Sequence, residues 1–274
     1  AGRAGRHGLL PGAHEGQAGR GGREAEAESV NLTPERIARI LSGRKFTVFF
    51  SGGKDSLAAL LWVLDNVTDI SGMRIIYAEI TGNTHPSCNE YVHDVIGALG
   101  LEDRFLHVRR GDTDFWAYMR KVGPPIYGVT RWCLTEFKRK AWLPHVWGAL
   151  AVMGLRGGES AYRAKYLQLK RTWEGQFTLM PIFSWSKEDV LDFIREHGLA
   201  PNPLYASYGH SGNCMFCPYY RRDQIVRTLS DPEWGPKITH ELVRAPVRGP
   251  VQAQIKERWL RLAGQATLPE VAAA

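Results

Sequence analysis

The sequence has no apolar stretch approaching about 18 residues, the length that a membrane-crossing helix requires. It has no charged-then-apolar leader, and only four cysteines are spread over its 274 residues. These absences argue against secretion, membrane insertion and a disulfide framework. We therefore expect a cytoplasmic protein that has no membrane partner and is stabilised by a packed core.

The first 30 residues also lack apolar periodicity and consist mainly of Gly, Arg, Ala and Glu. Such a segment cannot bury enough surface to offset the entropy lost on ordering, so we predict a disordered tail over 1–30. With 44% hydrophobic residues, the rest can form one core of the size common in α/β domains. The net charge of +7 and the pI near 9.3 are compatible with a polyanionic partner and equally with an ordinary, mildly basic surface.

Short apolar runs alternate with helical patterns from residue 46 onward. This alternation is typical of βαβ units, so we predict an α/β fold with a doubly wound parallel sheet. A short helix should come before it, with Thr33 at its N-cap, Pro34 in its first turn and Gly43 after its end. The predicted strands are Phe46–Phe50, Arg74–Ile80, Phe105–Arg109 and Ala149–Leu155; the predicted helices cover 56–66, 86–99 and 131–147; a hairpin (166–172 with 177–183, around Glu174-Gly175) and a helix capped by Ser186 and Asp189 follow.

The loop Ser51-Gly52-Gly53-Lys54-Asp55-Ser56 joins the first predicted strand to a helix. Its glycines can bring backbone N–H groups close to an anion, and the helix start adds positive partial charge. Lys54 would neutralise phosphate oxygens, and Asp55 would cap the helix or hold a magnesium ion through water. The loop is not a Walker A motif, which would need glycine where Val48 stands. We interpret it as a phosphate-binding loop, with an ordinary strand-to-helix turn as the alternative.

Further motifs follow this loop in a fixed order. They are Thr81-Gly82-Asn83-Thr84, Arg131-Trp132-Cys133 with Lys138, Gly154-Leu155-Arg156-Gly157-Gly158-Glu159-Ser160, Pro181-Ile182, Trp185-Ser186 with Asp189-Val190, and Asn202-Pro203-Leu204-Tyr205 before Cys214-x-x-Cys217. Together they resemble the PP-loop ATP pyrophosphatases, specifically the phosphoadenosine phosphosulfate (PAPS) reductase-like branch, over residues 45–220. The resemblance implies an adenine nucleotide alpha hydrolase-like domain over 31–205, followed by a Cys-x-x-Cys segment and a basic helical extension over 206–274.

The resemblance also implies where ATP and Mg²⁺ would bind. Arg156 would bind a phosphate through two hydrogen bonds, and Glu159 would orient a ribose hydroxyl, Arg163 or a metal, with a structural ion pair as the alternative for both. Lys54, Asp55 and Arg156 are the expected catalytic residues. The remaining nucleotide-binding residues would hold the polyphosphate (Ser51, Gly52, Gly53 and Ser56) and approach adenosine (Thr81, Gly82 and Asn83).

The cysteines bear on which metal cofactor we expect. In the iron-sulfur sulfonucleotide reductases that this chain resembles, a double cysteine on the middle helix and a later Cys-x-x-Cys bind the cluster. Here Cys133, Cys214 and Cys217 would hold a 4Fe-4S cluster, either with Cys88 as the fourth ligand or with one iron left open. Zinc held by cysteines and His210 is the alternative, and Cys88 can equally be a buried apolar thiol.

One departure from the reductases bears on the reaction. Their nucleophilic cysteine stands in a C-terminal segment, but no cysteine follows Cys217 here. The complete loop at 51–56 is also more similar to the relatives that cleave ATP. We therefore predict an enzyme that adenylates an acceptor, releases pyrophosphate and transfers sulfur. The alternatives are an APS or PAPS reductase that uses an external thiol, and a non-catalytic nucleotide-binding module with structural zinc.

Cations and aromatic residues are interleaved after Cys217. The aromatic residues are Tyr219, Tyr220, Trp234 and Trp259, and the cations are Arg221, Arg222, Arg227, Lys237, Arg244, Arg248, Lys256, Arg258 and Arg261. This pattern can bind nucleic acid, but a solvated pair of amphipathic helices has it too. The acceptor is therefore tRNA or DNA, or else a small molecule. A sulfur or electron donor protein is a further expected partner, and a homodimer stays open.

Overall fold

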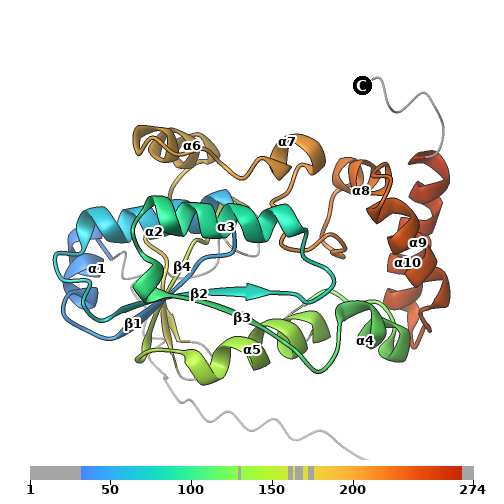
Figure 1. Cartoon of the computed structure of the whole chain (residues 1–274), viewed down its shortest axis with the longest axis horizontal. Coiled ribbons are helices and arrows are strands. Elements are labelled where there is room, and N and C mark those ends of the chain that lie inside the picture. Colours follow the sequence, from blue (N-terminus) through green and yellow to red (C-terminus); the bar gives the residue numbers. More distant parts are fainter. Residues whose placement is uncertain (1–31, 129–130, 160–162, 164–168, 172–175, 267–274) are drawn as a thin grey trace, which may run out of the picture.

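The computed structural model describes residues 32–128, 131–159, 163, 169–171 and 176–266, and it contains a six-stranded sheet with helices around it (Figure 1). The strands are β1 (Phe46–Phe49), β2 (Met73–Glu79), β3 (Phe105–Arg109), β4 (Leu150–Met153), β5 (Leu169–Arg171) and β6 (Phe177–Leu179). The α-helices are α1 (Pro34–Leu41), α2 (Lys54–Asn66), α3 (Pro86–Ala98), α4 (Phe115–Val122), α5 (Lys140–Trp142), α6 (Lys187–Glu196), α7 (Leu204–Tyr208), α8 (Arg222–Leu229), α9 (Trp234–Arg244) and α10 (Pro250–Ala266). The predicted tail over 1–30 and the turn at 174–175 lie outside the described residues.

The strand order is β3-β2-β1-β4-β6-β5, and all neighbouring pairs are parallel except β5 with β6. The chain builds outward from β1 through β2 to β3 and then returns to place β4 on the other side of β1. Strand order therefore reverses between β1 and β4. The loops that leave these two strands meet at the carboxyl edge of the sheet, where ligands of such folds bind. The predicted α/β fold is confirmed.

Local signals account for most element boundaries. Thr33 caps α1, because its side chain accepts the N–H of Arg36 at 3.3 Å. Ser186 and Asp189 form both bonds of the predicted capping box at the start of α6, at 3.0 and 2.8 Å. The described parts of the predicted hairpin pair antiparallel as β5 and β6.

The predicted helix over 131–147 is not one regular helix. A π-helical segment, Cys133–Arg139, leads into α5, and a 3₁₀ turn, Leu143–His145, ends it. Pro144 lies in this turn and has no N–H to donate, so it favours termination. The wider π-helical turn begins at Cys133 itself, and such turns occur frequently at functional sites.

Two large hydrophobic clusters and one small one form the interior of the described chain. The larger joins one face of the sheet to α1, α2, α3 and α6, whereas α5 covers the other face at β2 and β3 (Figure 1). The second surrounds the fully buried Trp259 and joins α4 and the π-helical segment to α7–α10, which lie beyond the carboxyl ends of the strands. The boundary expected at 205/206 falls inside α7, whose Leu204 and Tyr208 both belong to the second cluster. No helix in the described part of the chain combines the length and apolar character that a membrane crossing requires.

Candidate functional site

The phosphate-binding loop predicted at 51–56 runs from β1 into α2 at the reversal point of the sheet. Gly52 has a φ of 73°, and a Cβ there would lie 2.9 Å from the Cys88 sulfur, so both conformation and space require glycine. The Ser56 hydroxyl fixes the turn, because it donates to the Gly53 carbonyl at 2.8 Å and accepts the Ser51 N–H at 3.1 Å. Among the described residues, no acceptor engages the N–H groups of Gly52 and Gly53, which suits them to bind an anion.

One carboxylate lies between two cations beside this loop. The two Asp55 oxygens accept from Lys54 Nζ at 2.6 Å and from Arg156 Nε at 2.5 Å. The side chains of Asp55 and Lys54 are each 13% exposed, and that of Arg156 is 9% exposed. Solvent therefore screens their charges little. The group carries a net charge of about +1 and is complementary to an anion at the loop.

Gly154 brings Arg156 to this position. A Cβ at residue 154 would lie 2.1 Å from the Asp55 carbonyl oxygen, so only glycine lets the end of β4 approach the first turn of α2 this closely. Arg156 follows two residues later and pairs with Asp55, not with Glu159. Glu159 pairs instead with Arg163, which is one of the roles expected for it.

The turn after β2 differs from its expected role at one residue. Thr81 and Gly82 are half-buried, and the Thr81 hydroxyl donates to the Arg110 carbonyl at 2.6 Å. Asn83 is fully buried, and its side chain bonds the N–H and the carbonyl of Phe216 at 2.8 and 3.0 Å. Asn83 was expected to approach adenosine, but it holds the Cys-x-x-Cys segment in place.

Cys88 lies beneath the phosphate-binding loop. It is fully buried, and the Tyr77 hydroxyl, which also donates to Asn89 at 2.7 Å, is 3.7 Å from its sulfur. Burial raises the pKa of the Cys88 thiol to about 11. A Cβ on Gly212 would lie 3.6 Å from the Cys88 Cβ, so Cys88 is in contact with both the loop and the segment that leads to Cys214.

The other three cysteines are close to one another. Burial, followed by the nearby Cys214 sulfur, raises the pKa of Cys133 to about 11 and that of Cys217 to about 12. Cys133 and Cys214 both pack against the second hydrophobic cluster. All three are half-buried as residues. The Cys133 and Cys217 thiols keep their protons at neutral pH, and binding of a metal would have to release them.

The arrangement bears on which metal group these thiols fit. In the described part of the chain, no three His, Cys, Asp or Glu side chains converge as the ligands of a single ion must. Soft thiolate sulfurs are ligands that both zinc and iron-sulfur clusters take. His210, the zinc ligand considered above, already uses both ring nitrogens, accepting from the Gly212 N–H at 3.2 Å and bonding the Thr228 hydroxyl at 3.0 Å.

Sequence reasoning missed the contact of residues 202–211 with the phosphate-binding loop. The Asn202 amide donates to the Gly52 carbonyl at 3.2 Å and to the Ser211 carbonyl at 3.0 Å. The Tyr205 hydroxyl accepts the backbone N–H of Lys54 at 3.3 Å. Asn202 and Tyr205 stand among the family landmarks, but nothing in the sequence alone indicates that a segment so far along the chain reaches the loop.

The interleaved aromatic residues of the C-terminal region have a structural role for the most part. Trp234 and Trp259 are 3% and 0% exposed, so neither can stack on a base. The exposed aromatic surface near the cysteines comes instead from Tyr127 and Tyr219, whose rings are 5.3 Å apart, with Arg131 positioned 5.2 Å from the Tyr219 ring.

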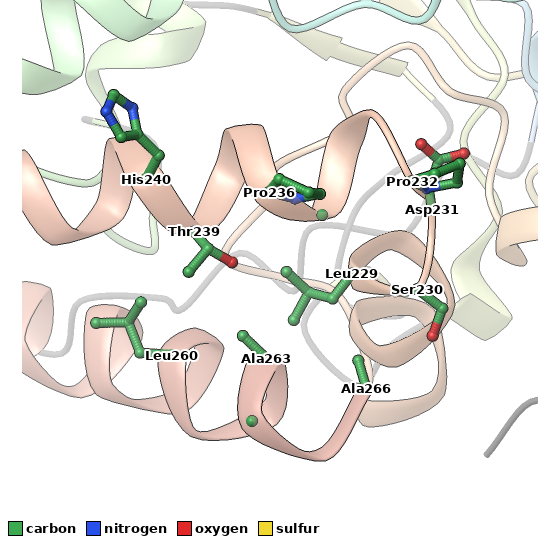
Figure 2. A pocket seen from close by; sticks show the side chains of 12 residues that line it. Leu229, Ser230, Asp231, Pro232, Pro236, Thr239, His240, Leu260, Ala263 and Ala266 are labelled. Atoms are coloured by element: carbon green, nitrogen blue, oxygen red, sulfur yellow. The ribbon is translucent and has the colours of Figure 1, made fainter. Parts of the chain in front are cut away.

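A separate groove of about 660 Å³ opens between α8, α9 and α10 (Figure 2). Apolar side chains such as Leu229, Leu260 and Ala263 line it together with Asp231 and Thr239. None of the residues predicted for the nucleotide or the metal lines this groove.

The match to a known family covers the loop at 51–56, the Arg156 segment and all four cysteines. The sequence profile of the phosphoadenosine phosphosulfate reductase domain matches residues 45–219, which is most of the described chain. The chain belongs to this family. The match begins at β1 and ends just after Cys217, so the C-terminal helices α8–α10 lie outside it.

Individual relatives share parts of the sequence. An uncharacterized 37.8 kDa protein of Escherichia phage 186 is 25% identical over 70% of this chain and 71% of its own length. An uncharacterized protein of Methanocaldococcus jannaschii is 28% identical over 62% of this chain but only 35% of its own length. The adenosine 5'-phosphosulfate reductase of Streptomyces coelicolor is 32% identical over 41% of this chain and 40% of its own length.

Solved structures show more remote likenesses. The phosphoadenylyl-sulfate reductase of Candida auris, in a phosphate complex, has a TM-score of 0.46 at 16% identity and covers 65% of this chain and 85% of its own. The FMN adenylyltransferase of Candida glabrata, in complex with ATP, has a TM-score of 0.39 at 15% identity and covers 61% of this chain and 53% of its own. Likenesses at this level carry no functional argument.

Proposed function

We propose that this member of the family binds ATP with Mg²⁺, adenylates an acceptor oxygen and releases pyrophosphate. The observation that carries the proposal is the complete loop at 51–56 together with the buried Lys54–Asp55–Arg156 group beside it. The acceptor oxygen would attack the α-phosphorus, a new phosphorus–oxygen bond would form, and the bond to the β-phosphate oxygen would break. Pyrophosphate would leave with the negative charge that the loop is built to stabilise.

The chain's own groups supply this stabilisation in three ways. The N–H groups of Gly52 and Gly53 would donate to phosphate oxygens at the start of α2, where the helix dipole adds positive charge. Lys54 and Arg156 would bring two cations to the polyphosphate, and Asp55 holds both in place before the nucleotide arrives. Such preorganised charge costs no rearrangement at the moment of reaction. Asp55 would also reach the Mg²⁺ through water.

The second half of the proposal is sulfur transfer. Cys133, Cys214 and Cys217 would hold an iron-sulfur cluster, which when bound would supply iron for binding the sulfur to be transferred. A sulfur donor protein would provide that sulfur at the sulfide level, so the transfer needs no oxidant or reductant. The sulfur would form a bond to the acceptor atom that carries the adenylated oxygen, the bond from that atom to the oxygen would break, and AMP would leave with the oxygen. Cys88 would serve either as a fourth ligand or, given its complete burial, as packing beneath the loop.

The acceptor would be tRNA or DNA, or a small molecule. Tyr127, Tyr219 and Arg131 favour the nucleic acid, because exposed tyrosine rings beside a cation can stack on unpaired bases and bind phosphate. They lie close to the cysteines, since Arg131 contributes to the electrostatic environment of both Cys133 and Cys217.

A second candidate function is reduction of an adenylyl-sulfate nucleotide. The local match to an adenosine 5'-phosphosulfate reductase favours it. The complete loop at 51–56 speaks against it, because reductases bind an already activated nucleotide, and residues 218–274 hold no cysteine that could act as the nucleophile. A non-catalytic nucleotide-binding module with structural zinc is a third.

Pyrophosphate release tests the adenylation step. The wild-type chain, given ATP, Mg²⁺ and a mixture of tRNA, DNA and candidate small acceptors, should release pyrophosphate. Lys54→Ala should lower that rate by at least about tenfold, which corresponds to about 1.4 kcal/mol in the barrier. Lys187→Ala, which removes an exposed lysine on α6, is the matched control and should keep the full rate. Equal rates in the Lys54→Ala and Lys187→Ala variants would show that the loop does not stabilise the departing pyrophosphate.

Anaerobic purification tests the cluster. The protein should be brown, with an absorption shoulder near about 400 nm and bound iron. Cys214→Ser and Cys217→Ser should each bleach it, whereas Cys88→Ser should do so only if four protein ligands are used. Colourless protein with stoichiometric zinc would contradict the cluster.

A further inference from the structure

Tyr205 brings a hydroxyl to the start of α2 from outside the phosphate-binding loop. Its oxygen accepts the backbone N–H of Lys54, the first residue of the helix, at 3.3 Å. The first N–H groups of a helix have no partner within the helix, and in phosphate-binding proteins they donate to the ligand. The Tyr205 oxygen therefore stands where a phosphate oxygen would otherwise approach.

Three hydroxyl groups lie around Gly53 of the phosphate-binding loop. A Cβ on Gly53 would lie 3.3 Å from the Tyr205 oxygen, 3.5 Å from the Ser51 oxygen and 3.8 Å from the Ser211 oxygen. No side chain at residue 53 separates these groups. Two of the three come from the 202–211 segment, which Asn202 fixes to the loop through the Gly52 carbonyl.

The Tyr205 hydroxyl is suited to donate. Burial raises the pKa of Tyr205 to about 12, so the hydroxyl keeps its proton at neutral pH. Its oxygen accepts from the Lys54 N–H, and a hydrogen bond from the Ser211 hydroxyl lowers the pKa of Tyr205 against the larger effect of burial. Because Tyr205 is the acceptor in both bonds, its own O–H hydrogen can be donated to an anion. The Lys54 ammonium group lies 5.6 Å from the centre of the same ring, so the cation and the hydroxyl face one region.

We propose that Tyr205 and Ser211 bind the polyphosphate of the nucleotide and complete its site from outside the loop. This inference rests on the proposed function and names two further binding residues for it. It gives the 202–211 segment a role beyond packing. Because Ser211 stands three residues before Cys214, a phosphate held by Ser211 would also order the backbone that leads to the cysteines.

Calorimetric titration with ATP, pyrophosphate and AMP tests this proposal. Tyr205→Phe keeps the ring and removes only the hydroxyl, and Ser211→Ala removes the second one. Each variant should bind ATP and pyrophosphate about five- to tenfold more weakly than the wild type, equivalent to about 1.0–1.4 kcal/mol. Affinity for AMP, which lacks the β- and γ-phosphates, should change less than about twofold because the base and ribose contacts stay intact.

Tyr91→Phe is the matched control. The Tyr91 hydroxyl donates to a backbone group near this segment, the Ala200 carbonyl at 2.8 Å, and makes no hydrogen bond to the loop among the described residues. Its removal should leave all three affinities unchanged. The inference would be overturned if the wild type binds ATP and the folded Tyr205→Phe and Ser211→Ala variants bind ATP and pyrophosphate with unchanged affinity. That result would leave the proposed function standing. A wild-type chain that binds neither ATP nor pyrophosphate would overturn both.

Discussion

Asp55 organises the charge of the candidate site, because its two oxygens hold two cations that come from different strands' loops. A buried carboxylate with one partner removed is costly, since the remaining charges are left poorly compensated. In the proposed function Arg156 would act on the nucleotide both directly and by positioning the Lys54–Asp55 pair.

Arg156→Ala should therefore weaken ATP binding by about 2 kcal/mol or more, as measured by calorimetry. Arg156→Lys keeps the charge but loses the planar donor pair, so it should recover only part of the affinity. Circular dichroism checks that both variants are folded. Unchanged affinity in folded Arg156→Ala would mean that the pair with Asp55 is purely structural.

The segment from Asn202 to Cys217 joins the two parts of the candidate site. It bonds the phosphate-binding loop through Asn202, and the turn after β2 through Asn83, whose amide bonds Phe216. Its backbone is held further by Lys138, which donates to the Asn213 side chain at 2.6 Å. One continuous element therefore contacts the loop at 51–56 and carries two of the cysteines.

His210 makes the stability of this segment dependent on pH. Burial lowers the pKa of His210 from 6.5 to about 3, so the unfolded chain binds a proton more readily than the folded one between these values. Stability that is present above about pH 6.5 is consequently lost as the pH falls toward 3. Protonation would also break the bond that the ring accepts from the Gly212 N–H.

Denaturant unfolding at pH 7, 6 and 5 measures this effect. Below pH 6 the wild type should lose up to about 1.4 kcal/mol per pH unit more than His210→Gln, which cannot titrate. Comparison of the two proteins cancels the contributions of the other histidines. Parallel pH profiles for the wild type and the variant would contradict the assignment.

The sequence predicts a structural feature well only where the residues that determine it are close together in the chain. The caps of α1 and α6, the glycines of the loop and the strands β1–β4 follow from local patterns, because the residues that determine them are neighbours in the chain. The pairing of Arg156 with Asp55 could not be derived in this way. It depends on Gly154 letting β4 approach α2, a contact between residues about a hundred positions apart.

The role of Asn83 also depends on a contact between residues that are far apart in the chain. Its position after β2 is the one where a nucleotide contact is expected, but tertiary packing gives its amide to Phe216, 133 residues later. Trp234 and Trp259 were candidates for base stacking by composition, and both are buried in the second hydrophobic cluster. Residue type and spacing cannot distinguish an exposed aromatic ring from one that fills a core.

The molecule as a whole places a phosphate-binding loop and a group of cysteines at the carboxyl edge of one sheet. The region that matches the family, residues 45–219, contains both. The two candidate reactions for this chain are cleavage of ATP and reduction of a sulfonucleotide. The complete loop at 51–56 favours the first reaction. These two reactions have different substrates and different products, so a single assay can separate them.

That assay supplies ATP and adenylyl sulfate separately to anaerobically prepared protein and measures pyrophosphate and sulfite in both reactions. Each reaction contains Mg²⁺, a reducing thiol protein and a mixture of candidate acceptors. We expect pyrophosphate from ATP and no sulfite from adenylyl sulfate, with the pyrophosphate signal diminished in Lys54→Ala. Robust release of sulfite from adenylyl sulfate, with ATP inert, would contradict the proposed reaction and identify the chain as a reductase.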